Sequence, residues 1–348
     1  MTPSPSDPFR SPAEFREAFA AGLFSLLQEE GLGALILVCA NATFEAALWE
    51  RLRDPLQRRF AQTAGRWRDA LTGGGSLSTP EEDLLVFLKM ALIGFDGFRL
   101  TEQRAAGPWR VQFNQLRALR PPRASGRRID HLRADFDSHG FHFDKPFLKK
   151  EAFWAGDLAG RRVALLYNKF PFAGLHGLLI PEAERHLPQF LTERYHAWLW
   201  QVVAQLGEGI PGFGAAYNAL GAYASVNHLH FQTFVEPAGL PLMDPRWRHN
   251  GGGEDYPLAC HRFGEPARAW EFLESMHHHN QSYNLLYTPG AAYCLPRRKQ
   301  GELELPKWTA GPAWSEMAGA IVTFNRDHYQ GLTAEAIAAE LAAWNLGE

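Results

Sequence analysis

The stretch YASVNHLHFQTF, residues 223–234, alternates polar and apolar side chains in its second half. Residues two apart in a strand point to the same side of the sheet. A strand here would place His228, His230 and Gln232 on one face, and the leucine and phenylalanine between them would face a core. The three polar groups must then line a surface, a cleft or a metal site.

Composition restricts what the chain can bind. Its 348 residues are 46% hydrophobic and 21% charged, which is ordinary for one large or two modest globular domains. The net charge of −3 gives no general attraction to nucleic acid or anionic membrane, so any contact with phosphate must be local. The longest apolar run, LGALILVCA at 32–40, is far below the ~20 residues of a membrane helix. The N-terminus lacks the basic and apolar pattern of a signal peptide, so we expect a cytoplasmic protein.

The three cysteines, Cys39, Cys260 and Cys294, are widely separated and form no C-x-x-C motif. This spacing argues against a disulfide framework or a thiolate zinc site and fits a reducing compartment.

Helical patterns dominate residues 1–95, which we predict to be an N-terminal helical region. Ser11 and Thr79 begin capping sequences ahead of amphipathic runs. Another amphipathic stretch begins near Thr43, and we expect Pro55 to interrupt it.

From residue 98 onward the pattern predicts strands joined by short turns, with a few helices. The basic segment 117–128 is expected to be an exposed connector. The predicted elements are a hairpin (98–116), two strands (162–172 and 176–183), a helix (188–206), two strands (213–218 and 227–235), a helix (266–279), a hairpin (283–298) and a final helix (334–345). This order predicts an α+β fold with an antiparallel sheet over residues 98–348.

The most visible histidine cluster, residues 277–279, ends a predicted helix. Consecutive residues point about 100° apart on a helix, so these three cannot all bind one metal. We predict an exposed helix end, where imidazoles suit the helix dipole.

Three interpretations of His228 and His230 remain open from the pattern alone. The pair could be solvated on an exposed sheet face, or supply half of a metal-ligand set. Alternatively, one histidine could attack a phosphorus centre. Such a nucleophile must hold its proton on Nδ1 against a fixed acceptor so that Nε2 presents a lone pair. Nearby donors must also neutralise the phosphoryl oxygens in the transition state.

The segment before the histidines offers such donors. Asn218, Ser225 and Asn227 carry donor groups, and Gly221 lets the backbone approach a phosphate closely. Lys169 is an isolated cation beside a predicted strand end. Taken singly, each of these residues is also typical of turns, caps or exposed surface.

The segment FGAAYNALGAYASVNHLHFQ (213–232), with its H-x-H-x-Q motif, resembles the nucleotidyltransferase branch of the histidine triad superfamily. That branch includes galactose-1-phosphate uridylyltransferases, dinucleoside tetraphosphate phosphorylases and GDP-hexose phosphorylases. The stretch is most similar to the GDP-L-galactose and GDP-D-glucose phosphorylases. Segments 168–191 and 283–298 resemble a strand pair and a hairpin of the same enzymes. The resemblance extends over roughly residues 98–330 and implies a histidine-triad-like antiparallel sheet.

The resemblance also implies a mechanism. His230 would attack the α-phosphorus of a nucleoside diphosphate hexose, expel hexose 1-phosphate and hold the nucleotidyl group until inorganic phosphate removes it. The carbonyl of His228 would accept the Nδ1 proton of His230, and Gln232 would bond the phosphoryl group. Related hydrolases carry a third histidine at this last position. An amide cannot readily protonate a leaving group, which favours transfer over hydrolysis.

Further site residues follow from the same resemblance. The residues expected to bind the substrate are Asn168, Lys169, Asn218, Gly221, Ser225, Asn227 and Arg297. No metal or cofactor is expected, because the cysteine pair that binds metal in some uridylyltransferases has no counterpart. Leu175 stands where the superfamily usually has glycine, and we assign no role to the following His176.

The alternatives are a dinucleoside tetraphosphate (Ap4A) phosphorylase, to which Asn168 and the residues after it are more similar, a metal-binding protein that uses both histidines, and a nucleotide-binding regulator without turnover. The expected partners are a nucleotide and phosphate.

Overall fold

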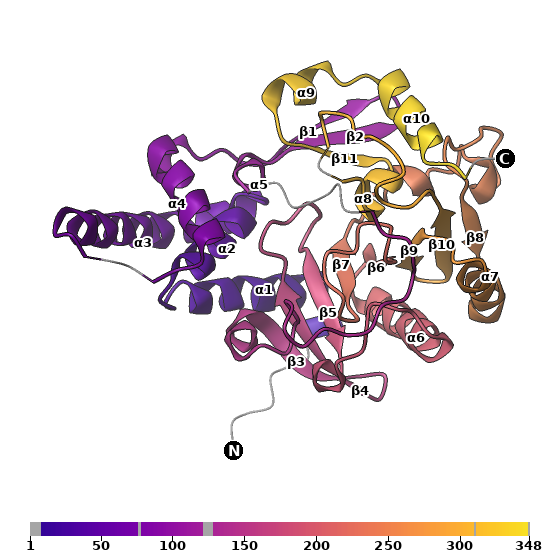
Figure 1. Ribbon diagram of the computed structural model, residues 1–348, viewed down its shortest axis with the longest axis horizontal. Helices are drawn as coiled ribbons and strands as arrows, with labels where there is room; N and C mark the ends of the chain where they lie inside the picture. Colours follow the sequence, from indigo (N-terminus) through magenta and orange to yellow (C-terminus); the bar gives the residue numbers. More distant parts are fainter. Residues whose placement is uncertain (1–7, 76–77, 121–127, 310, 347–348) are drawn as a thin grey trace.

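The computed structural model describes residues 8–75, 78–120, 128–309 and 311–346 (Figure 1). Most of the predicted connector at 117–128 lies outside these ranges. An eight-stranded antiparallel sheet forms the centre. In spatial order its strands are β3 (Ala152–Leu158), β4 (Arg161–Tyr167), β5 (Gly177–Pro181), β7 (Phe231–Val235), β6 (Phe213–Asn218), β9 (Tyr283–Thr288), β10 (Ala291–Pro296) and β8 (His261–Phe263).

A second, three-stranded sheet lies beside α9 and α10 in Figure 1. It consists of β1 (Glu102–Ala106), β2 (Trp109–Phe113) and β11 (Ala320–Thr323). The first two strands form the hairpin predicted around the Gly-Pro turn, and β11 adds to β2 in parallel.

The α-helices of the described residues are α1 (Pro12–Leu26), α2 (Leu32–Ala42), α3 (Ala46–Thr72), α4 (Glu81–Ile93), α5 (Gln115–Ala118), α6 (Glu193–Gly209), α7 (Pro266–His278), α8 (Trp314–Met317), α9 (Arg326–Gly331) and α10 (Ala334–Ala343). Helix α7 ends at the histidine cluster, as predicted. None of the helices in the described part of the chain is long and apolar enough to span a membrane. The predicted α+β class is confirmed.

Two details of the sequence prediction are wrong. Pro55 does not interrupt the second helical stretch, because α3 continues through it. Leu52 and Leu56, on either side of the proline, are fully buried. Their packing offsets the backbone hydrogen bond that proline removes from a helix interior.

The strand predicted at 227–235 begins only at Phe231. Before that point the backbone bonds to another segment, because the N–H of Leu229 donates to the carbonyl of Leu187 (2.8 Å) and that of His230 to Gln189 Oε1 (2.9 Å). The side chains of Leu229 and Phe231 are nevertheless buried, as expected.

The two faces of the central sheet pack against different cores. Phe231 and Tyr217 face a core that includes residues of α1, α2 and α6. Phe234 and Ala216, on the opposite face, pack with residues of the small sheet, α8 and α10. Gln232 points to this second face because it alternates with Phe231, so the C-terminal elements cover one side of the candidate site.

The N-terminal helices pack directly on the central sheet. The ring of Phe19 in α1 lies 5.1 Å from that of Phe153 and 4.7 Å from that of Tyr167. Buried residues of α1 to α4 and of the sheet belong to one hydrophobic cluster. The division into a helical region (1–95) and a sheet domain (98–348) stays a prediction.

The shared core makes the stability of both regions depend on the same contacts. Replacement of Phe19, which is 1% exposed, by alanine is expected to lower the free energy of unfolding by about 3–5 kcal/mol. We expect helical circular dichroism and tryptophan fluorescence to shift together in urea, because the lost contacts join helix and sheet. Leu92→Ala, at a position 89% exposed, is the control. A shift confined to the helical signal would instead show that the two regions unfold separately.

Candidate active site

His230 lies in the loop that leads into β7 and is only 4% exposed. Its Nδ1 donates to the backbone carbonyl of His228 over 2.8 Å. The side chain of Gln189 forms hydrogen bonds with the backbone of His230. Its Oε1 accepts the backbone N–H of His230, and its Nε2 donates to the carbonyls of His230 (3.2 Å) and Asn218 (3.0 Å). The His230 ring is therefore fixed through its own backbone and through Nδ1.

This arrangement determines what His230 can do chemically. Because Nδ1 carries the proton, Nε2 keeps its lone pair. Burial lowers the pKa of His230 to about 4, although the hydrogen bond to His228 opposes the shift. The imidazole is therefore neutral and nucleophilic at neutral pH.

His228 is also buried and uncharged at neutral pH. Its Nδ1 accepts the backbone N–H of Phe143 (3.0 Å). Burial, followed by the neighbouring rings of His230, His142 and His186, lowers its pKa to about 4. The metal interpretation required both histidines to offer a lone pair to one ion. Because His228 Nδ1 accepts a hydrogen bond, the neutral ring carries its proton on Nε2 and has no free lone pair. No group of three or more metal-binding side chains is found in the described ranges.

Gln232 is half-buried and meets two residues from other elements. Its Oε1 accepts the indole N–H of Trp314 in α8 (2.9 Å) and lies 3.0 Å from Nε2 of His176. Trp314 itself is fully buried and stacks on Phe234, with ring centroids 5.0 Å apart.

His176, for which no role was predicted from the sequence, thus lies at the site. It is fully buried, and its Nδ1 accepts the backbone N–H of Phe172 (3.2 Å). Burial, with a smaller contribution from the charge of Arg117, lowers the pKa of His176 to about 3. Leu175 has φ +44°, the left-handed region that glycine favours. Leucine therefore keeps the backbone conformation expected for the glycine that the superfamily usually has there.

The loop after β4 carries Asn168 and Lys169, both of which were expected to bind the substrate. Asn168 Nδ2 lies 3.3 Å from His176 Nε2, so this residue is at the site. Lys169 is not an isolated cation, because its ammonium forms an ion pair with Asp83 of α4. Its charge connects the N-terminal helices to this loop.

Asn218 and Gly221 lie behind His230, in and after β6. Asn218 is 4% exposed, and its Oδ1 accepts from Asn284 Nδ2 (2.7 Å) and from the backbone N–H of Trp314 (3.2 Å). Gly221 has φ +80°, and a Cβ there would lie 2.3 Å from Ser282 Oγ. Only glycine fits this turn without a shift of its neighbours.

The other two predicted donors of this segment differ in exposure. The Asn227 side chain is already used, since Oδ1 accepts the N–H of Gln189 (2.9 Å) and Nδ2 donates to the carbonyl of Asp135 (2.7 Å). It ties neighbouring loops to the histidine segment. Ser225 is exposed.

Arg297 was expected to bind the substrate, and the structure places it in the interior. It is fully buried, with its guanidinium carbon 4.0 Å from the ring centroid of Trp344. Its Nη1 donates to Asn284 Oδ1 (3.1 Å) and to the carbonyl of Pro312. Burial lowers its pKa to about 9. The residue reaches the site through Asn284 and Asn218.

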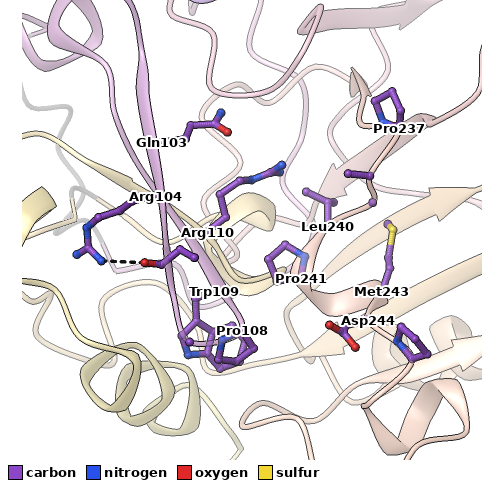
Figure 2. A pocket seen from close by; sticks show the side chains of 15 residues that line it. Gln103, Arg104, Pro108, Trp109, Arg110, Pro237, Leu240, Pro241, Met243 and Asp244 are labelled. Carbon is purple, nitrogen blue, oxygen red and sulfur yellow. Dashed lines mark hydrogen bonds between the residues drawn. The ribbon is translucent and has the colours of Figure 1, made fainter.

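A cavity of about 770 Å³ lies elsewhere, between the β1–β2 hairpin and the loop 237–245 (Figure 2). Arg104, Trp109 and Arg110 line one side, and Pro241 and Met243 line the other. None of the predicted site residues contributes to its lining, so this cavity is separate from the histidine site.

Sequence reasoning missed His176, Gln189 and Trp314. The first could have been found from strand register. Leu178 pairs with Gln232 across β5 and β7, which makes His176 a diagonal neighbour of Gln232 on the same face. Gln189 and Trp314 lie in loops or short helices that carry no periodic signal.

Part of the chain is similar in sequence to known proteins. Residues 108–234 match the family described as GDPGP1-like, N-terminal domain. GDP-D-glucose phosphorylase 1 of Danio rerio is 30% identical over 150 residues, which are 38% of this chain and 43% of that protein. The Homo sapiens protein of that name is 34% identical over 142 residues, 38% of this chain and 35% of that one. GDP-L-galactose phosphorylase 1 of Arabidopsis thaliana is 30% identical over 147 residues, 38% of this chain and 33% of that one.

The chain thus spans less than half the length of these curated relatives. Its fold is similar to the crystal structure of yeast Ap4A phosphorylase Apa2, with a TM-score of 0.50 and 17% identity over 78% of this chain and 97% of that chain. The resemblance to the phosphorylase branch of the histidine triad superfamily is confirmed.

The buried neutral histidines make stability depend on pH. His176, His228 and His230 have pKa values of about 3 to 4 when folded, against an ordinary value of about 6.5 when unfolded. The unfolded chain therefore binds more protons below pH 6.5, and stability is lost as the pH falls from there towards 4. As the pH falls from 7 to 5, preferential protonation of each of these histidines in the unfolded chain should reduce the free energy of unfolding by roughly 1–2 kcal/mol.

Urea unfolding at several pH values measures this loss. His176→Asn should make the decline shallower, whereas His279→Asn, at the exposed end of α7, should leave it unchanged. Equal pH dependence in wild type and H176N would contradict the assignment.

Proposed function

We propose that the chain is a nucleotidyltransferase-type phosphorylase that cleaves a nucleoside diphosphate hexose, with GDP-hexose favoured, into nucleoside diphosphate and hexose 1-phosphate. One observation carries the proposal. A buried, neutral His230 is held with Nδ1 on the His228 carbonyl and its lone pair on Nε2. The matches to GDP-D-glucose and GDP-L-galactose phosphorylases support the substrate class.

In the first step, His230 Nε2 attacks the α-phosphorus of the nucleotide sugar. An N–P bond forms, and the P–O bond to the second phosphate breaks. Hexose 1-phosphate leaves with the electron pair as a phosphate anion and needs no proton. The Nδ1 proton remains against the carbonyl of His228, which stabilises the positive charge that develops on the ring.

In the second step, an oxygen of inorganic phosphate attacks the same phosphorus. The N–P bond breaks, the electron pair returns to Nε2, and nucleoside diphosphate is released. Gln232 supports transfer in both steps, because an amide can donate a hydrogen bond to the phosphoryl oxygens but does not act as a general acid.

A labelling experiment tests the covalent step. Brief incubation with a nucleotide sugar labelled at the α-phosphorus, without phosphate, is expected to give an acid-labile, base-stable adduct. In His230→Ala, adduct formation should fall by at least ~10³-fold, because no other group can replace the nucleophile. His196→Ala removes an equally buried histidine of α6 and should keep the adduct.

Parallel reactions with phosphate present identify the donor. We expect turnover with a GDP-hexose to exceed that with ADP- and UDP-sugars or diadenosine tetraphosphate. Preference for diadenosine tetraphosphate would favour the Ap4A phosphorylase alternative. Tight nucleotide binding without any adduct would favour a nucleotide-binding regulator without turnover. Zinc or iron that is bound by the wild type and lost in both His228→Ala and His230→Ala would favour a metal-binding protein.

The pH profile provides an independent test of the nucleophile. The rate of adduct formation should be constant from pH 8 to about pH 5.5 and fall at lower pH with a midpoint near 4, because protonation of His230 removes its lone pair. Single-turnover rates give this profile, with each reaction stopped by base because the adduct is acid-labile. A midpoint near 6.5 would show that the attacking group is an unperturbed, exposed histidine.

A further inference from the structure

We infer that His176 is a positioning residue that acts together with Trp314 to fix the side-chain amide of Gln232 with its nitrogen towards the reacting phosphoryl group. This inference rests on the proposed function for the identity of the reaction. The hydrogen-bond geometry itself depends only on residues of this chain.

The orientation of the Gln232 amide follows from Trp314. An indole N–H can only donate, so the Gln232 atom 2.9 Å from Trp314 Nε1 must be the carbonyl oxygen. Within the described ranges, Gln232 Nε2 has no hydrogen-bond acceptor, and this nitrogen is not buried. Both of its hydrogens are therefore available to a ligand.

The tautomer of His176 follows from Phe172. The backbone N–H of Phe172 donates to Nδ1, so that nitrogen carries the lone pair. A neutral imidazole then has its proton on Nε2, which lies 3.0 Å from Gln232 Oε1. His176 thus donates to the same oxygen as Trp314. Asn168 Nδ2 lies 3.3 Å from His176 Nε2, but with the proton on Nε2 both atoms are donors, so this is a contact and not a hydrogen bond.

The position of His176 is in turn set from the N-terminal helices. Asn41 of α2 donates to the carbonyl of Asn168 (3.0 Å), and Asp83 of α4 pairs with Lys169. The backbone N–H of Leu175 donates to Oε1 of Glu45, which immediately precedes α3 (3.2 Å). The loop that ends at His176 is therefore held at both ends by these helices, which gives them a role in the site.

The Gln232 side-chain amide can adopt two orientations that exchange its oxygen and its nitrogen, and the two donors stabilise one of them. If Gln232 turned over, its oxygen would face the phosphoryl oxygens and repel them. Two donors on Oε1 exclude that state before the substrate arrives, so no reorganisation is needed as charge develops. Loss of one donor should therefore slow nucleotidyl transfer more than it weakens nucleotide binding.

A double-mutant cycle on the single-turnover rate of nucleotidyl transfer tests this inference. In wild type, His176→Asn removes the donor and should slow the step about 10- to 100-fold, with nucleotide affinity changed less than about 3-fold. His176→Gln, whose longer amide can donate from the Nε2 position, should recover most of the rate. In a Gln232→Ala background, His176→Asn should have almost no further effect, because its target is gone.

His196→Asn is the matched control. His196 is also buried, with both ring nitrogens within hydrogen-bond distance of neighbours (2.7 and 3.0 Å), but it lies outside the site and should leave the rate unchanged. Trp314→Phe removes the other donor and should slow the step to a similar extent. The inference is overturned if His176→Asn slows the Gln232→Ala enzyme as much as wild type, or if His176→Gln is no faster than His176→Asn.

Nitrogen-15 NMR of histidine-labelled wild-type protein separates this inference from the proposed function. His176 is expected to show a protonated Nε2 and an unprotonated Nδ1 from pH 5.5 to 8. A proton on Nδ1 would overturn the inference whatever the enzyme does. Failure of the wild type to form an adduct with any nucleotide donor would reject the proposed function while the tautomer result still stands.

Discussion

The hydrogen bond from His230 Nδ1 to the carbonyl of His228 is the interaction on which the rest of the site depends. This bond forms where the backbone is outside regular strand pairing, because β7 begins only at Phe231. That departure leaves backbone groups without ladder partners in a buried region, which is costly unless other groups replace them. Gln189 and the carbonyl of Leu187 supply the replacements, so the chain remains satisfied where the strand has not yet begun.

The groups around the nucleophile are mostly neutral amides, and this has an electrostatic consequence. Gln189 bonds the backbone carbonyl of Asn218, and Asn284 joins the Asn218 side chain to the buried Arg297. Arg297 is therefore connected to His230 only through these intervening amides. No carboxylate contacts the His230 ring in the described residues. Burial can therefore depress the pKa of this histidine without an anion that would favour its protonated form.

The order of the predicted elements indicated the α+β class and the hairpins correctly. The face predicted to be shared by His228, His230 and Gln232 assumed a strand from residue 227, but β7 begins only at Phe231. The predictions also failed where partners are distant in sequence. Lys169 looked isolated because Asp83 is 86 residues away. The burial of Arg297 was not predicted, because the ring that covers it, Trp344, lies at the end of α10. Pro55 was expected to interrupt a helix, but burial of its neighbours Leu52 and Leu56 keeps α3 continuous. The contact of His176 with Gln232 requires strand register, which alternation alone does not specify.

In the proposed reaction, the choice between phosphate and water depends on the residue beside His230. A nucleotidyl-histidine must survive until phosphate arrives, although water is far more concentrated. Burial of His230, which is 4% exposed, limits the access of water and of phosphate alike and does not separate them. The amide at the Gln232 position is neither a general acid nor a general base, so attack by water has no such assistance there. Phosphate is already an anionic nucleophile and needs no such help. Its attack depends instead on oriented donors such as the Gln232 amide, which links the fixed orientation of that side chain to transfer over hydrolysis.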